Sequence, residues 1–308
     1  MAGRCSGDEG ARRARGASVA VALLLSLGTV AAAAAAGFAG EVEIRDGRGL
    51  YMECRGRGTP TVILEAGLRS RSDFWSVRAQ PGQRRTVLGS VSRFTRVCQY
   101  DRPGTTLGTE EVSRSDPVPM PRTAGDAVAD LHALIRAAPI RGPIVLVGHS
   151  TGGLIARLYA STHPRHVVGM VQVDALNERI QREMTPEHFA QYYELNAGPL
   201  PGLEAYADLE VVDFYKSFRQ MRRAKRREPP REIPLIVISR GEPFGLPPEL
   251  GADFIADAER AWRKGQRMLA RLPGARHWIA ERSAHYVMFD QPRIVIRAIR
   301  RVVADARR

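Results

Sequence analysis

The sequence lacks the patterns by which common metals and nucleotide cofactors are bound. No spacing of histidine, cysteine and aspartate resembles a metal site, and no glycine-rich phosphate loop occurs. Internal repeats and long disordered stretches are missing as well. The 308 residues are 44% hydrophobic, which is enough for one large α/β domain with an insertion or for two small domains. We therefore expect a folded protein that needs no metal and no cofactor.

Lysine is also scarce: among 46 basic residues, the only lysines are Lys216, Lys225 and Lys264. The formal net charge is +13. A GC-rich coding bias would give this excess of arginine without any binding function. The densest basic run, residues 222–227, contains no aromatic residue, so nucleic-acid binding by stacking has no support. We expect a solvated helix face there; the alternative is contact with anionic lipid or an acidic wall polymer.

Residues 1–39 differ in kind from the rest of the chain. Four arginines precede an apolar stretch from Ala17 to Leu27, and an alanine run follows. A charged start, an apolar middle and small residues at the end are typical of an export signal. We expect cleavage after Ala36 or Ala39 and a secreted or periplasmic protein. Because residues 18–38 approach the length of a bilayer span, an uncleaved N-terminal anchor stays open as the alternative.

The pentapeptide Gly-His-Ser-Thr-Gly at residues 148–152 follows an apolar run, residues 143–147, and precedes a helix-like stretch. A serine on a sharp strand-to-helix turn has strained backbone geometry, so the positions two before and two after it must be nearly free of side chain. The helix behind it directs its N-terminal N–H groups at the place where an acyl oxygen would develop negative charge. Ser150 is therefore the candidate nucleophile; the alternative is a chance match in a chain with 29 glycines.

Short apolar strands alternate with amphipathic helices along most of the chain, as a parallel sheet requires. A hairpin turning at residues 46–49 comes first, and a closing amphipathic helix covers residues 292–306. Between them we expect strands at 61–64, 95–100, 143–147, 167–173, 233–238 and 276–279. Residues 177–232 break the alternation, since they are helical in pattern, rich in tyrosine, phenylalanine and charge, and punctuated by proline. We expect an inserted helical cap in this range.

This order of motifs resembles the α/β-hydrolase superfamily over nearly everything after residue 41. The motifs that carry the resemblance are Leu64–Gly67, Tyr100–Gly104, Gly148–Gly153, Val173–Ala175 and Ser283–His285. The resemblance implies a mostly parallel eight-stranded sheet with helices on both faces, built from residues 41–176 and 233–308, and a helical cap or lid of residues 177–232. Similar proteins include esterases, lipases and other capped serine hydrolases, and some members that lost activity.

A serine nucleophile needs a base, and histidine is suited to take and return its proton. His285 is the best placed of seven histidines, because it follows the last expected strand, where the superfamily has its base. The acid is open between two residues. In most relatives it follows the strand at 233–238, but there this chain has Glu242, and Phe244 stands where the commonest spacing would put aspartate. Asp174 ends the preceding strand, a position that some lipase-like relatives use, and we prefer it. Its alternative role is that of a turn or cap residue.

The resemblance places an oxyanion hole at the backbone N–H groups of Leu68 and Thr151. Many relatives have His-Gly in the first of these loops, whereas this chain has Ala66-Gly67. Because the donors are backbone groups, that change need not abolish them.

Cys5 falls in the expected signal, which leaves Cys54 and Cys98 in the mature chain. An even pair in an exported protein suggests a disulfide. The superfamily's strand order supports a Cys54–Cys98 bridge, because the strands that carry the two cysteines are neighbours in it. Two buried free thiols are the alternative.

The residues therefore predict an exported serine hydrolase that forms an acyl-enzyme on Ser150, most readily from a small-molecule or lipid ester. Thioesterase, amidase, perhydrolase and acyltransferase activities stay open within the same triad. Dehalogenase and epoxide hydrolase relatives use an aspartate nucleophile, so Ser150 argues against both. The alternative from a different class is a noncatalytic binding protein on the same scaffold, which would be free to lose Ser150 or His285.

Overall fold

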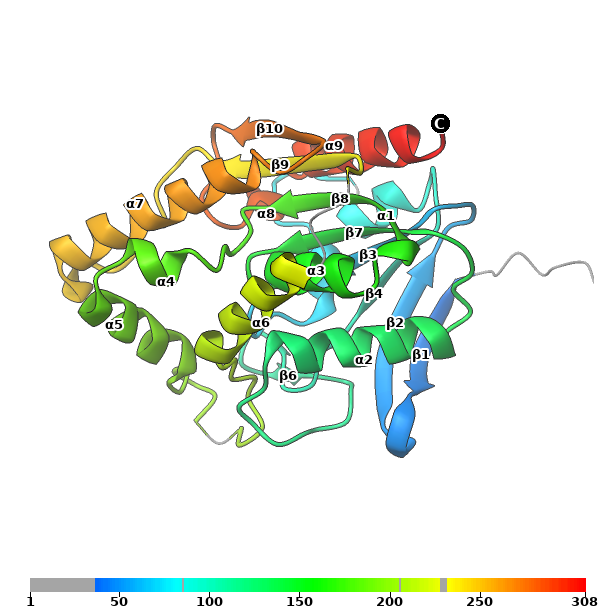
Figure 1. Ribbon diagram of the computed structural model, residues 1–308. Coiled ribbons are helices and arrows are strands. Elements are labelled where there is room, and N and C mark those ends of the chain that lie inside the picture. Colours follow the sequence, from blue (N-terminus) through cyan, green and yellow to red (C-terminus); the bar gives the residue numbers. More distant parts are fainter. Residues whose placement is uncertain (1–36, 85, 205, 228–231) are drawn as a thin grey trace, which may run out of the picture. The chain divides into compact units, whose positions relative to one another are not determined.

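The computed structural model describes residues 37–308 except 85, 205 and 228–231 (Figure 1). Nearly all of the expected signal or anchor, residues 1–39, lies outside the described residues. In the described part, eight strands form one sheet in the order β1-β2-β4-β3-β7-β8-β9-β10. Their bounds are Phe38–Glu43 for β1, Gly49–Arg55 for β2, Thr61–Glu65 for β3, Val97–Tyr100 for β4, Ile144–His149 for β7, Val167–Val173 for β8, Leu235–Arg240 for β9 and Ala275–Ala280 for β10.

The sheet is mostly parallel, which confirms the eight-stranded sheet predicted from the motif order. Strand β2 pairs antiparallel with β1 and with β4, and all the other neighbours pair parallel. A separate antiparallel pair of very short strands joins β5 to β6; its bounds are Thr106–Leu107 and Glu111–Val112. Parallel neighbours bring the carboxyl ends of β7, β8 and β9 to the same edge of the sheet.

Helices cover both faces of this sheet. Their bounds are Val87–Val91 for α1, Ala124–Ala137 for α2, Thr151–Thr162 for α3, Ile180–Glu183 for α4, Pro186–Ala197 for α5, Phe214–Arg227 for α6, Ala252–Leu269 for α7, Val287–Asp290 for α8 and Pro292–Ala306 for α9. Side chains alternate along a strand, so a buried central strand serves two cores. In β7, Ile144 and Leu146 pack with α2 and α3, while Val145 and Val147 pack with α1 and α9.

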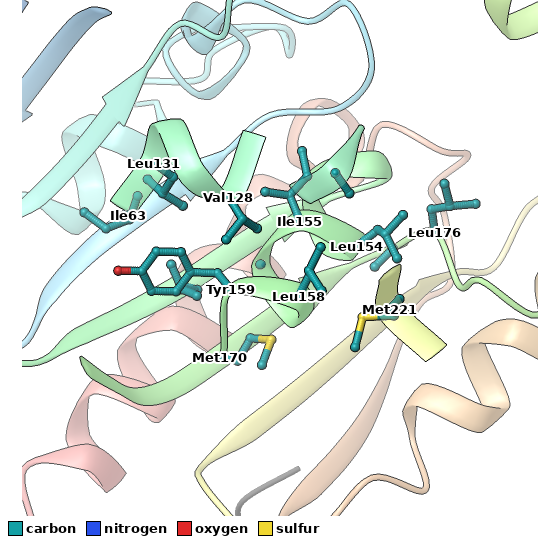
Figure 2. Close-up of a cluster of buried hydrophobic side chains, with 14 of the residues drawn as sticks. Ile63, Val128, Leu131, Leu154, Ile155, Leu158, Tyr159, Met170, Leu176 and Met221 are labelled. Atoms are coloured by element: carbon teal, nitrogen blue, oxygen red, sulfur yellow. The ribbon is translucent and has the colours of Figure 1, made fainter. Parts of the chain in front are cut away.

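Figure 2 shows the first of these cores in close-up. Buried apolar side chains from α2, α3, α6 and the sheet fill it; among them are Leu131, Ile155, Tyr159, Met170 and Met221. The Tyr159 side chain is fully buried, and its hydroxyl lies 3.2 Å from His132 Nδ1 at the edge of the core. This core fixes α3 against the sheet and with it the position of the residue that precedes the helix.

The expected insertion, residues 177–232, contains α4, α5 and α6. Helices α4 and α5 contact α7, whereas α6 packs against α2 and α3 over the sheet. Buried Glu178 bonds to Arg157 of α3 at 2.9 Å and to Lys225 of α6 at 2.6 Å. The lysine of the basic run therefore has an internal partner. Among the arginines of the run, Arg223, Arg226 and Arg227 are exposed.

Cys54 and Cys98 stand opposite each other in the antiparallel register of β2 and β4. Their sulfur atoms form a disulfide, which links positions 44 residues apart in the sequence. Both cysteines are fully buried in the first core. The bond thus ties the antiparallel edge of the sheet to its parallel centre.

Within the residues that the structure describes, no helix has both the length and the apolar character that a membrane crossing requires.

Candidate active site

Ser150 stands between the end of β7 and the start of α3. Its φ is 52° and its ψ is −123°, a conformation that an L-residue adopts at a cost of about 1–3 kcal/mol. Two hydrogen bonds hold the turn in place: the Ser150 N–H donates to Val173 O at 3.2 Å, and the Leu176 N–H donates to Ser150 O at 2.8 Å. The strain and its supports are those of a strand-to-helix turn that projects a serine from the sheet edge.

Glycine is required on both sides of this serine. A Cβ added at Gly148 would lie 2.5 Å from Gly152 O, and one added at Gly152 would lie 2.4 Å from Ala66 O. Both distances are too short for non-bonded atoms, and both approached atoms belong to the backbone. The spacing of glycines in the pentapeptide thus reflects the close approach of three backbone segments around Ser150.

His285 lies between β10 and α8, at the same edge of the sheet. Its Nδ1 is 2.7 Å from Oδ2 of Asp174, the residue that follows β8. Asp174 is fully buried and has a positive φ of 38°. The structure therefore brings His285 and Asp174 into direct contact across 111 residues of sequence.

The Asp174 carboxylate receives further donors in its buried site. Trp262 Nε1 of α7 donates to Oδ1 at 3.0 Å, and the Arg240 guanidinium donates to Oδ2 at 3.1 Å. Burial alone would raise the pKa of Asp174, but the His285 hydrogen bond and the Arg240 charge outweigh it and hold that pKa below its usual range. Asp174 is thus ionised at neutral pH and accepts a hydrogen bond from Nδ1–H of His285.

Glu242, the other candidate acid, is exposed, and among the described residues its side chain makes no interaction with His285. Its backbone N–H donates to Ser283 O at 3.0 Å. The Phe244 ring contacts the His285 ring instead, with ring centroids 5.2 Å apart. The Arg240 guanidinium stacks on the Phe244 ring, 3.5 Å from its centroid. An aromatic contact therefore stands where the commonest superfamily pattern would put an acid.

His149 packs beneath His285, with ring centroids 4.6 Å apart. Its Nε2 lies 3.0 Å from His285 O, so this nitrogen carries the proton and donates to the carbonyl. Its Nδ1 is buried and has no hydrogen-bond partner among the described residues. Burial lowers the pKa of His149 to about 3, so the ring is neutral at physiological pH. His149 thus supports the loop that carries His285.

Ser150 and His285 line one cleft of about 480 Å³. The apolar part of its wall includes Phe74, Leu195, Leu200, Leu203 and Tyr286. The polar lining includes Arg69, Asn196 and Thr109. The cleft is large enough for a small organic molecule.

The loop after β3 passes close to Ser150. A Cβ added at Gly67 would lie 3.4 Å from Ser150 Cβ and 2.9 Å from His149 Nδ1, so a bare backbone is needed here. The next peptide carries the N–H of Leu68. On the other side, the Thr151 N–H belongs to the first turn of α3, where N–H groups have no partner within the helix. Both expected oxyanion donors therefore lie in segments that flank Ser150.

The sequence did not predict that Trp262 and Arg240 are hydrogen-bond partners of Asp174. A usable signal for Trp262 was the spacing of Phe254, Ala258, Ala261, Trp262 and Leu269, which gives α7 one apolar face. Nothing local to Arg240 indicates its partner, because the contact with Asp174 spans 66 residues.

Comparisons with known proteins agree with this architecture. Residues 62–298 match the model of a family described as the alpha/beta hydrolase family. The uncharacterised protein YqjL of Bacillus subtilis strain 168 is 28% identical over 247 residues, which are 80% of this chain and 84% of that protein. A pimeloyl-[acyl-carrier protein] methyl ester esterase of Chromobacterium violaceum is 30% identical over 182 residues, 56% of this chain and 69% of that protein.

Among solved structures, the haloalkane dehalogenase DatA of Agrobacterium tumefaciens C58 is similar with a TM-score of 0.61. The alignment covers 88% of this chain and 97% of that one at 14% identity, so it shows the fold alone. The strand order, the serine turn and the match over residues 62–298 lead to one conclusion: this chain belongs to the alpha/beta hydrolase family.

Proposed function

We propose that this protein hydrolyses carboxylic esters through an acyl-enzyme on Ser150. The observation that carries the proposal is the 2.7 Å contact between His285 Nδ1 and the buried Asp174 carboxylate, at the cleft that Ser150 also lines. A nucleophile, a base and an acid that orients the base are the groups that acyl transfer from a serine requires.

In the proposed reaction, ionised Asp174 holds the proton on Nδ1 of His285, which leaves Nε2 as the base. The Ser150 hydroxyl attacks the ester carbonyl carbon and gives its proton to Nε2. The tetrahedral intermediate collapses, the bond to the alkoxy group breaks, and the alcohol leaves with that proton. Water then attacks the acyl-enzyme by the same route, releasing the carboxylic acid and restoring Ser150.

The negative oxygen of each tetrahedral intermediate needs N–H donors at about 3 Å. We assign this role to the backbone N–H groups of Leu68 and Thr151. The positive end of the α3 dipole adds to the stabilisation at the second of these positions.

For the substrate, we propose a neutral ester with an apolar acyl group of short to medium length. Its support is the group of apolar side chains in the wall of a cleft of about 480 Å³, in which no acidic side chain is present among the described lining residues. The relative from Chromobacterium violaceum bears the name of a methyl ester esterase, which favours ester cleavage over the other acyl transfers.

For location, we propose export, with cleavage of the N-terminal segment after Ala36 or Ala39. Its support is the charged, then apolar, then alanine-rich order of that segment, together with the Cys54–Cys98 disulfide, since disulfides persist in oxidising compartments. Intact mass measurement of protein from the culture medium or periplasm tests this: loss of the first 36 or 39 residues is expected, and full-length protein in a membrane fraction would contradict it.

The activity is tested with p-nitrophenyl esters of rising chain length, on the wild type and on Ser150→Ala. We expect turnover by the wild type with a maximum at short or medium chains, and a loss of kcat of about 10⁶-fold in the variant, the scale seen when the nucleophile of a triad is removed. A folded wild type without turnover on any ester would overturn the proposed function.

A further inference from the structure

The loop that carries the Leu68 N–H is held by a buried arginine from another strand end. Arg102 follows β4, and its guanidinium donates to two consecutive carbonyls of the loop: Nη1 to Ala66 O at 2.9 Å and Nη2 to Gly67 O at 2.6 Å. The Ser70 N–H donates to Gly67 O as well, at 3.2 Å. The Gly67 carbonyl is therefore fixed in direction from two sides.

The direction of this carbonyl also sets the direction of the proposed oxyanion donor. Gly67 C=O and the Leu68 N–H belong to one peptide unit, which is planar and trans, so the two bonds point in opposite directions. Because the carbonyl points to Arg102, the Leu68 N–H points away from Arg102. A rotation of this peptide would turn the donor away from the substrate oxygen.

Arg102 is itself held between two buried carboxylates. Its Nη1 lies 2.5 Å from Glu65 Oε1, and its Nε lies 2.6 Å from Glu210 Oε1; the three side chains are between 1% and 6% exposed. The Tyr100 hydroxyl donates to the second oxygen of Glu65. Burial alone would lower the pKa of Arg102, but the charges of Glu210 and Glu65 outweigh it and raise that pKa. The guanidinium is thus permanently charged and forms ion pairs with both carboxylates.

Glu210 holds the same loop at a second point, one residue beyond the Leu68 N–H. The Arg69 N–H donates to Glu210 Oε2 at 2.6 Å, and Arg69 Nε donates to Glu210 O at 3.0 Å. Arg69 has a φ of 57°, a left-handed conformation that costs a non-glycine residue about 1–3 kcal/mol. The bond from its N–H to a buried carboxylate opposes the relaxation of that strain.

Glu210 comes from the segment between α5 and α6, which is 141 residues away from Arg69 in the sequence. The same segment supplies Leu200 and Leu203 to the wall of the cleft. Arg69 Nη2 also donates to Gly198 O in this segment, at 2.6 Å. The cleft wall and the loop are therefore joined by two guanidiniums and two carboxylates whose formal charges cancel: Arg69, Arg102, Glu65 and Glu210.

We propose that Glu210 and Arg102 are positioning residues, which hold the loop of residues 66–70 so that the Leu68 N–H is aimed at the oxyanion. The inference rests on the proposed ester hydrolysis and deepens it. It makes the segment between α5 and α6 a part of the catalytic apparatus, although none of the cluster's side chains needs to touch the reacting atoms.

The test compares two buried glutamates of residues 177–232. Glu210→Gln removes the charge that holds Arg102 and Arg69, and we expect kcat on a p-nitrophenyl ester to fall at least about tenfold, with KM changed less than about twofold. A displacement of about 1 Å in a catalytic group can cost about 100-fold in rate. Glu178→Gln is the matched control. Glu178 is buried as well, at 3% exposed, and it is paired with two cations, Arg157 and Lys225, neither of which belongs to the loop of residues 66–70.

Binding of an alkyl boronic acid, which forms a tetrahedral adduct with serine, gives the second readout. Its affinity should fall in parallel with kcat in Glu210→Gln and stay unchanged in Glu178→Gln, since only the adduct carries the oxyanion. If Glu210→Gln does not fold, Arg102→Lys decides by the same two measurements, because lysine keeps the positive charge but lacks the planar fork of donors that reaches Ala66 O, Gly67 O and Glu210 together.

The outcomes separate the two proposals. A wild type that turns over esters, together with a folded Glu210→Gln of unchanged kcat and boronate affinity, overturns the positioning role and leaves the proposed function standing. An equal loss of kcat in Glu178→Gln also overturns it, because general destabilisation would then explain both. A wild type that hydrolyses no ester overturns the proposed function and the inference together.

Discussion

Asp174 and Glu242 differ at the residue scale in the environment that the fold gives to two chemically similar groups. Each follows or lies near the end of a parallel strand, and the sequence alone leaves both as candidate acids. Asp174 is buried beside His285, Trp262 and Arg240, whereas the Glu242 side chain is exposed. The sequence favours Asp174 without excluding Glu242, because the donors around Asp174 come from β9 and α7, far along the chain.

Replacing Asp174 by Asn is expected to lower kcat by about 10⁴-fold, since the amide cannot hold the proton on Nδ1 of His285 in the way that a carboxylate does. The matched variant Glu242→Gln should keep kcat within about twofold. Both are measured by ester turnover, with circular dichroism as the check on folding. The reverse order of effects would make Glu242 the acid.

His149 predicts a pH dependence of stability. Its pKa is lowered to about 3 in the folded protein, against an ordinary value near 6.5. Between these values the unfolded chain binds a proton that the folded chain does not, so the stabilisation is complete above about pH 6.5 and is lost as the pH falls toward 3.

As the pH falls through that window, His149 therefore lowers the free energy of unfolding by about 1.4 kcal/mol per pH unit. In His149→Asn, this part of the slope should be absent, while the other titrating groups still contribute theirs. Urea unfolding at a series of pH values from about 6.5 to about 4 measures the difference. Parallel curves for wild type and variant would show that His149 is not buried in its neutral form.

At the scale of elements, most of the sheet could be predicted, because its strands are short apolar runs bounded by turn residues. The hairpin before β3 and the helix α2 were also predicted, because their signals lie within the segment itself. At the start of α2, Thr123 and Asp126 form a reciprocal capping box. The long helix α7 and the pair β5–β6 were not predicted. The cluster of Glu210 and Arg102 has no local signal at all, since its contact spans 108 residues.

The disulfide between β2 and β4 gives a prediction about these elements. Closing a loop over a separation of 44 residues restricts the unfolded chain and is worth about 2–4 kcal/mol. The double variant Cys54→Ala/Cys98→Ala should lose about that much free energy of unfolding in urea, without a change in the ester specificity. As the control, the denatured, unreduced mature protein should show no titratable thiol, and two thiols would contradict the bridge.

At the scale of the whole molecule, the charge is strongly unbalanced. The net charge is +13, and three exposed arginines at the end of α6, Arg223, Arg226 and Arg227, form the densest exposed part of the basic run. A cationic surface of this kind is attracted to anionic lipid, and the attraction weakens with salt. A solvated helix face is the expectation from the sequence, and contact with a membrane surface or another anionic envelope component is its alternative.

Flotation with vesicles that contain phosphatidylglycerol tests that contact. A solvated helix face predicts that the mature protein does not float at low salt. If the alternative holds, the protein floats, and neutralising the three α6 arginines to Gln removes it from the floating fraction. The matched control neutralises three exposed arginines elsewhere, Arg267, Arg271 and Arg293, and should leave flotation unchanged. Equal losses in both triple variants would assign the binding to net charge and not to the end of α6.

Labelling with a fluorophosphonate tests the central claim most directly. The purified mature protein is treated with the probe and digested, and the modified peptide is identified by mass spectrometry, with Ser150→Ala alongside. Our account predicts one labelled site, Ser150, no labelling in the variant, and loss of ester turnover in proportion to labelling. A folded wild type that stays unlabelled, or a probe attached to another residue, would contradict it.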